Sequence, residues 1–245
     1  MMPSFAGTLL LLTAALPAAV AGGALGFGTG LVMLPLVVWV VGVRASVPVL
    51  TFSLIVGNVS RAWWSRDELD WRVIGAYLLG AVPLAAIGSV LYTATPPEWL
   101  SRLMGLVLLS ALPLRRWLER GPRRMRLRHF PVLGGATGLL SALVAATGPV
   151  NLPFFLGYGL RRGAYVGTDA VCAAAVHVTK TLVYGRYALL TPETSALGLA
   201  IGAVMFVGAF LGRRILERMS DRSFVVALEV LVVGLGVVFL VHPPH

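Results

Sequence analysis

Apolar residues fill most of the chain in long, uninterrupted runs, and polar residues gather in short stretches between them. A transmembrane helix needs roughly 20 mostly apolar residues, and eight runs are close to that length. They lack the alternation of apolar and polar residues that membrane-spanning strands show. The pattern predicts membrane helices over 5–22, 45–60, 73–92, 99–114, 129–146, 164–184, 194–212 and 223–241, with two shorter apolar segments at 31–41 and 149–159.

Composition points to the same fold class. Hydrophobic residues make up 58% and charged residues 12% of the 245 positions, against about 25% charged in a typical soluble domain. The mean hydropathy is +0.86. A soluble fold of this size cannot bury so much apolar surface, so we predict an all-α, polytopic bundle of membrane helices whose surroundings are the lipid bilayer.

The net charge of +10 does not indicate a nucleic-acid partner, because the basic residues lie between apolar runs and not on a soluble face. Basic loops of membrane proteins stay on the cytoplasmic side. If the chain alternates sides at every apolar segment, 16 of the 20 Lys and Arg residues fall on one side. This predicts a multi-pass protein of the cell (cytoplasmic or inner) membrane, with inside regions 61–72, 115–128, 161–162 and 213–222.

The chain contains an internal repeat. Gly30–Pro35 matches Gly148–Pro153 at an offset of 118 residues, and Asn58–Arg61 matches His177–Lys180 at an offset of 119. Each half holds an odd number of apolar segments, so the second half enters the membrane with reversed orientation, as in many secondary transporters. We predict a first transmembrane repeat over 1–118, a basic cytoplasmic linker over 119–128 and a second transmembrane repeat over 129–245.

Each half carries a break rich in Gly and Pro. The first is Gly22–Gly30, followed by Pro35, and the second is Thr147–Pro153. A broken helix frees amide groups that bind anions at the start of the next helix, and such breaks in both halves are the best sequence sign of a transporter's binding site. Close helix packing or a surface turn also fits the glycines. The substrate-binding residues predicted here are Gly28, Thr29, Gly30, Thr147 and Gly148.

Two basic residues lie at repeat-related positions in or beside apolar runs. Lys180 is the only lysine among nineteen arginines, and a charge at membrane depth is costly unless it is paired or faces a cavity. We predict that Lys180 binds the anion. For Arg61, beside two tryptophans, we favour snorkelling, in which a long side chain carries its charge to the membrane surface.

Further polar residues lie in the same segments. Asp169 and His177 are two helical turns apart, so they share a helix face, and Lys180 follows three residues after His177. If transport is coupled to protons, Asp169 or His177 would carry the proton, since histidine titrates near neutral pH. The alternatives are that Asp169 caps a helix or pairs with Arg161 or Arg162, and that His177 is a core residue. Asn58 and Asn151, together with His177, are predicted to contact the substrate or neighbouring helices.

A family resemblance rests on these motifs. A glycine-rich break followed by Pro in each half, then Gly159-Leu160-Arg161-Arg162 and Lys180-Thr181-Leu182-Val183-Tyr184-Gly185, resembles the sulfite exporter TauE/SafE family over nearly the whole chain. The resemblance implies transport of a small anion, with sulfite or an organosulfur compound as the first candidate.

The leading hypothesis is therefore a secondary transporter that holds a small anionic substrate between two inverted halves. We expect no cofactor and no metal, and no ATP-binding segment is visible. An intramembrane enzyme built on Cys172, His177 and Asp169, a non-transporting membrane subunit and a channel remain alternatives. A homo-oligomer also remains open.

Overall fold

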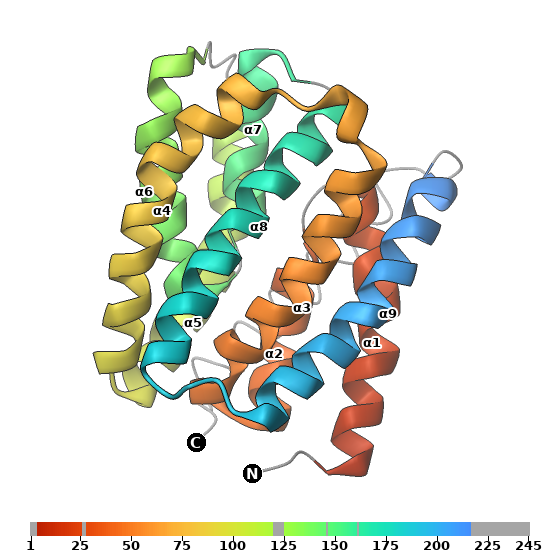
Figure 1. The fold of residues 1–245 in the computed structure, drawn as a ribbon, viewed down its shortest axis with the longest axis vertical. Coiled ribbons are helices and arrows are strands. Elements are labelled where there is room, and N and C mark those ends of the chain that lie inside the picture. Colours follow the sequence, from red (N-terminus) through yellow and green to blue (C-terminus); the bar gives the residue numbers. More distant parts are fainter. Residues whose placement is uncertain (1–3, 26–27, 120–124, 146, 161, 217–245) are drawn as a thin grey trace.

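The computed structural model describes residues 4–25, 28–119, 125–145, 147–160 and 162–216. These residues form helices and connecting segments without a strand, so the all-α prediction is confirmed for the part described (Figure 1). The predicted segment 223–241 lies outside the described residues. The elements are α1 Phe5–Leu25, α2 Thr29–Val41, α3 Val43–Trp64, η1 Arg66–Glu68, α4 Trp71–Ala94, α5 Pro97–Glu119, η2 Leu127–His129, α6 Phe130–Val144, α7 Gly148–Tyr158, α8 Arg162–Arg186 and α9 Pro192–Leu216.

Five of the described helices are long and apolar enough to cross a membrane: Phe5–Gly23, Val43–Trp64, Trp71–Ala94, Leu127–Val144 and Pro192–Gly212. Helix α8 has 25 residues, which at about 1.5 Å per residue also spans the ~30 Å hydrocarbon core. It is less apolar because it carries Asp169, His177 and Lys180. Helix α5 continues to Glu119, so Arg115 and Arg116 are helical and not part of the loop that the sequence predicted.

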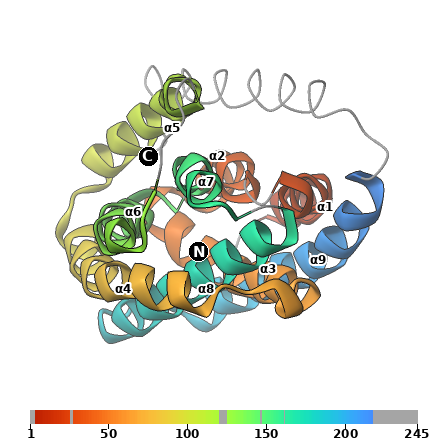
Figure 2. The same cartoon turned by 90° about the horizontal axis from the view of Figure 1, so that it is seen from above.

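Helices from distant parts of the chain lie side by side. Helix α4 packs against α6 and α8, while α1 and α3 pack against α9. The view from above shows α2 and α7 between the α4–α6 pair and the α1–α9 pair (Figure 2). Each of these two pairs combines one helix from the early part of the chain with one helix from the late part. The long helices therefore enclose the two short ones.

Glycines allow the two helices of each outer pair, α4–α6 and α1–α9, to approach each other closely. A Cβ on Gly138 of α6 would lie 2.6 Å from the Ala81 carbonyl oxygen of α4, and a Cβ on Gly134 would overlap the Tyr77 carbonyl. In the other pair, a Cβ on Gly208 of α9 would lie 2.9 Å from the Leu16 carbonyl oxygen, and one on Gly212 would overlap Val20. Small residues spaced four apart permit such backbone contact in membranes.

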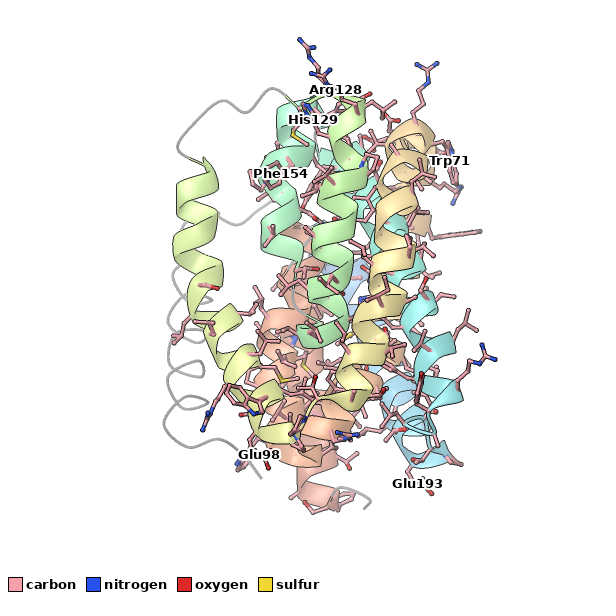
Figure 3. All side chains as sticks on the ribbon, turned by 90° about the vertical axis from the view of Figure 1, so that its left-hand side faces the viewer. Trp71, Glu98, Arg128, His129, Phe154 and Glu193 are labelled. Atoms are coloured by element: carbon pink, nitrogen blue, oxygen red, sulfur yellow. The ribbon has the colours of Figure 1, made fainter. Side chains whose placement is uncertain are left out.

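The described residues of the segments predicted to lie inside gather at one end of the bundle. Trp71, Arg128 and His129 lie at the upper end in Figure 3, and Glu98 and Glu193 lie at the lower end. The ends of α3, α7 and α9 are also at the upper end, as is the start of α8 (Figure 1). These described residues therefore share one end of the bundle, and the assignment of that end to the cytoplasm stays a prediction.

Candidate functional site

The two predicted helix breaks meet in the structure. Helix α1 ends at Leu25 and α2 begins at Thr29, while α6 ends at Val144 and α7 begins at Gly148. A Cβ added to Gly30 would lie only 2.7 Å from the carbonyl oxygen of Ala145. Positions that are 115 residues apart in the sequence are thus in backbone contact, and glycine is required at one of them.

Backbone geometry fixes the shape of both breaks. Gly28 precedes α2 with φ 106° and Ala145 follows α6 with φ 57°, both in the left-handed region that favours glycine. The first α-helical bond of α2 runs from Val32 N to Gly28 O at 3.0 Å. The amides between these residues precede the helical ladder, so the amino end of α2 presents free N–H groups. The hydroxyl of Thr29 donates to the Ala18 carbonyl at 3.2 Å and ties this turn to α1.

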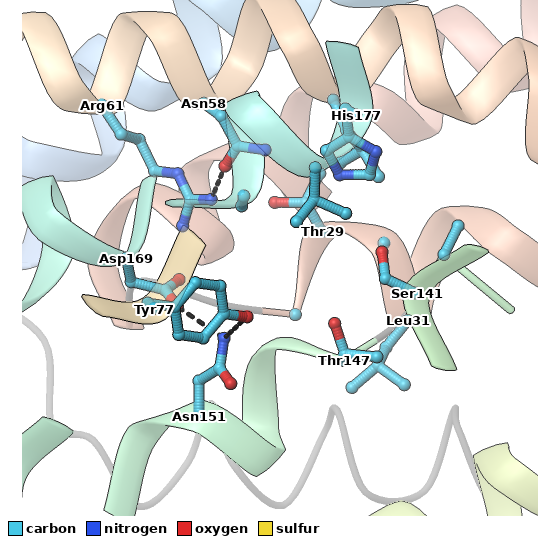
Figure 4. A pocket seen from close by; sticks show the side chains of 16 residues that line it. Thr29, Leu31, Asn58, Arg61, Tyr77, Ser141, Thr147, Asn151, Asp169 and His177 are labelled. Carbon is cyan, nitrogen blue, oxygen red and sulfur yellow. Dashed lines mark hydrogen bonds between the residues drawn. The ribbon is translucent and has the colours of Figure 1, made fainter. Parts of the chain in front are cut away.

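A cavity of about 60 Å³ lies where the breaks meet. One water molecule needs roughly 10–15 Å³ on a comparable measure, so a small anion of a few heavy atoms fits. The lining comes from the turn before α2 and from α2, α3, α4, α6, α7 and α8 (Figure 4). The residues are Gly28, Thr29, Gly30, Leu31, Leu54, Asn58, Arg61, Tyr77, Ser141, Ala145, Thr147, Asn151, Asp169, Ala173, Val176 and His177.

Helix periodicity explains how α3 and α8 supply the polar lining. Leu54, Asn58 and Arg61 follow one another at spacings of four and three residues, which places them on one face of α3. Ala173 and His177 on α8 lie 119 residues after Leu54 and Asn58. The packed helices α3 and α8 thus present repeat-related faces to the same cavity.

Arg61 is placed differently from the sequence expectation. Its guanidinium lines the cavity and its Nη2 donates to Asn58 Oδ1 (Figure 4). The preferred snorkelling interpretation is therefore wrong, because the side chain turns toward the bundle interior. Arg61 also lies close enough to Asp169 for their opposite charges to attract.

Asp169 is held by a chain of neutral polar groups. Asn151 Nδ2 donates to Asp169 Oδ1 at 2.8 Å and to the Tyr77 hydroxyl oxygen at 3.3 Å. The Tyr77 hydroxyl and Thr137 Oγ1 are 2.6 Å apart. The Asn151 carbonyl oxygen Oδ1 is buried without a hydrogen-bond partner among the described groups. Asp169 lies in the interior of α8, so it does not cap that helix.

Lys180 lies beside the cavity but is not among the described lining residues. Its side chain is fully buried, and Nζ donates to the Ser141 carbonyl at 2.9 Å and contacts His177 Nδ1 at 3.3 Å. Ser141 is in the last turn of α6, and its carbonyl also accepts from Ala145 N at 2.8 Å. The Tyr184 hydroxyl donates to the next carbonyl, Ala142, at 2.7 Å. The Lys180 ammonium thus supports the end of the broken helix α6, and its role in holding the anion stays a prediction.

Eight predicted site residues line the cavity: Gly28, Thr29, Gly30, Asn58, Thr147, Asn151, Asp169 and His177. Gly148 begins α7 directly after Thr147. Tyr77 and Ser141 were not expected from the sequence, because they resemble ordinary helix residues in apolar runs. The repeat offset did contain a signal for Arg61, since it relates that residue to the buried Lys180.

A second hollow, of about 410 Å³, lies toward the lower end of the bundle. Val43, Arg44 and Val49 of α3 line it together with Glu193 at the start of α9. Along α3, the buried residues Leu50, Thr51 and Ser53 separate this hollow from the cavity at the breaks. Within the described residues, no group of three or more His, Cys, Asp or Glu side chains is placed to hold a metal ion.

Comparison with curated proteins and with solved structures gave no match. A family model does match, over residues 10–239, and its description is sulfite exporter TauE/SafE. This match covers both helix breaks and every described residue that lines the cavity. The chain therefore belongs to the sulfite exporter TauE/SafE family and is a multi-pass membrane transporter.

Proposed function

We propose that this chain is a secondary transporter that moves a small anion, with sulfite or an organosulfur anion as the first candidate, across the cytoplasmic membrane. Family membership supports transport, and the family description supports sulfite as the first anion to test. The energy would come from the substrate gradient or from a coupled ion. The basic upper end of the bundle supports a cytoplasmic location for that end.

One observation carries the proposal: two helix amino ends and a guanidinium converge on one buried cavity. Helix α2 begins at Thr29 and α7 begins at Gly148, and the residues at both starts line the cavity. A helix amino end carries roughly half a positive charge and unpaired N–H groups. Arg61 adds a full charge and a planar set of donors suited to oxyanions.

The lining suggests distinct roles in binding. Arg61, positioned by Asn58, would bind the oxygens of the anion, and the amides of Gly28, Thr29 and Gly30 would donate from one side. Thr147 and Gly148 would contact the anion from the other side. Asn151 and His177 complete the polar lining, and Asp169 or His177 remains the candidate for proton coupling. Lys180 would position Ser141 and His177.

We also propose that residues 1–118 and 129–245 form two inverted halves that move against each other around this cavity. The packed pairs α1–α9 and α4–α6 support the proposal, since each pair contains one helix from each half. The second hollow, at the lower end, supports access from the opposite side of the membrane. Rocking of one half against the other would expose the cavity to each side in turn.

The function is tested by measuring uptake of radioactive sulfite into vesicles that contain the purified protein. We expect saturable uptake above that of protein-free vesicles, because one cavity binds one anion at a time. Thiosulfate, sulfonates and simple carboxylates added as competitors would rank the anions by affinity. Sulfite uptake equal to that of protein-free vesicles, with no competitor transported in its place, would contradict the proposal. Flux that never saturates would favour a channel.

A further inference from the structure

A carboxylate lines the cavity that we assign to an anion. Asp169 is 2% exposed and faces the same space as Arg61 and His177 (Figure 4). Two negative charges repel strongly at short range in a medium of low dielectric constant. The presence of Asp169 therefore restricts which anions can bind.

The charges that surround the cavity leave a small positive excess. Arg61 and Asp169 carry opposite charges and attract each other. The amino ends of α2 and α7 contribute about half a positive charge each. The carboxyl ends of α1 and α6 at the same two breaks contribute about half a negative charge each. The Lys180 ammonium, which faces the Ser141 carbonyl at the end of α6, adds one positive charge. About one net positive charge is left to compensate a bound anion.

The remaining groups around Asp169 are neutral. Asn151 of α7 donates to its carboxylate, and Tyr77 of α4 lies behind Asn151. Cys172, one turn along α8, is a buried thiol near the carboxylate. His177 contacts the Lys180 ammonium through Nδ1, and that nitrogen accepts a hydrogen bond only in the neutral imidazole. Of the described groups that face Asp169, Arg61 alone brings a full opposite charge.

We propose that Asp169 limits each transport cycle to one net negative charge, an inference that rests on the anion transport proposed above. A monoanion binds without a proton, and a dianion binds together with one proton. That proton is bound to the Asp169 carboxylate or to the anion, and it is released together with the anion on the far side of the membrane. A dianion bound without it would leave one buried charge uncompensated, which is strongly unfavourable.

Sulfite itself is the best probe, because it converts between hydrogen sulfite, a monoanion, and the sulfite dianion near neutral pH. One molecule thus presents both charge states to the same cavity. The quantity to measure is the charge moved per sulfite, obtained from the membrane potential at which net sulfite flux reverses. Potassium and valinomycin set that potential in vesicles that contain the purified protein.

For the natural chain we expect one charge per sulfite at both acidic and alkaline pH. Asp169→Asn removes the negative charge but keeps the side-chain size, so the cavity then compensates two charges. We expect that variant to move two charges per sulfite at alkaline pH. Asp67→Asn is the matched control, because its side chain is 91% exposed on η1, and it should behave like the natural chain.

A rise from one to two charges per sulfite in the natural chain as the pH increases would overturn the inference. The transport function would survive that result, since sulfite would still move. If sulfite fails to move at any pH, both the function and the inference fall. The natural chain alone can overturn the inference, so the test remains decisive against it even if Asp169→Asn folds poorly.

Discussion

Arg61 and Lys180 occupy corresponding positions in the two halves of the sequence, yet their charged groups have different surroundings. Arg61 lines the cavity and donates to Asn58, three residues earlier on α3. Lys180 contacts His177, three residues earlier on α8, but donates to the Ser141 carbonyl at the end of α6. The repeat preserves a cation next to a polar side chain. It does not preserve what that cation binds.

The difference shows that a buried cation in a helix bundle has two ways to be satisfied. It can face a cavity that receives an anion, or it can bind a carbonyl in the last turn of a broken helix. Arg61 uses the first and Lys180 the second. Substitutions that affect transport and stability differently can separate these roles.

The largest effect is expected for Arg61→Gln. Truncation of one member of a buried, hydrogen-bonded charge pair costs about 2–5 kcal/mol, and about 1.4 kcal/mol corresponds to a factor of ten. The initial rate of sulfite uptake should therefore fall by roughly 30-fold or more. Arg72→Gln, at the exposed start of α4, is the control and should retain the natural rate. Equal uptake by both variants would remove Arg61 from the binding site.

Lys180→Met should act mainly on stability. The change keeps the apolar stem but removes a charge-assisted bond worth about 1.5–3 kcal/mol. The Ser141 carbonyl still accepts from Ala145 N at 2.8 Å. We expect the melting temperature in detergent to fall by several degrees and transport per folded molecule to fall less than in Arg61→Gln. An unchanged melting temperature with abolished transport would instead place the ammonium on the anion.

The two helix breaks should respond oppositely to small substitutions. Ala145 adopts the left-handed conformation, with φ 57°, and this conformation costs an L-amino acid about 1–2 kcal/mol. Because glycine does not pay this cost, Ala145→Gly should raise the melting temperature. Gly28→Ala places a side chain at φ 106° and should lower it by a comparable amount. The melting temperatures of both variants are measured by thermal unfolding in the same detergent. Shifts of the same sign in the two melting temperatures would contradict the backbone conformations at Gly28 and Ala145.

The smallest effect is expected for Tyr77→Phe. The change removes a hydroxyl that contacts Asn151 and Thr137, worth about 1 kcal/mol. Thr137 keeps its bond to the Leu133 carbonyl and Asn151 keeps its bond to Asp169. Sulfite uptake should fall by a few-fold at most. Tyr187→Phe, at an exposed tyrosine, is the control, and complete loss of uptake would give the Tyr77 hydroxyl a direct role in binding.

Much of the fold could be predicted because lipid imposes simple rules on sequence. Backbone groups in a membrane must be bonded within the helix, so long apolar runs such as 73–92 coincide with helices such as α4 Trp71–Ala94. Glycine and proline mark the breaks before Thr29 and Gly148 for equally local reasons. The organisation into 1–118, 119–128 and 129–245 remains a prediction, because residues 217–245 lie outside the described part.

The site could be predicted only in part, because it depends on contacts between distant segments. Gly28, Thr29 and Thr147 could be found from the breaks that contain them. The direction of the Arg61 side chain depends on Asn58 and on the space left between α3 and α8, and no local pattern encodes that space. Tyr77 enters the cavity because α4 packs against α6, which brings it to Asn151.

The central claim is that both helix breaks and Arg61 bind one anion in a shared cavity. Anomalous diffraction from crystals grown with selenite, the selenium analogue of sulfite, tests this claim most directly. We expect a selenium peak within hydrogen-bonding reach of the Arg61 guanidinium and of the amides at the start of α2 and α7. A selenium peak bound elsewhere in the bundle, with none in that cavity, would contradict it.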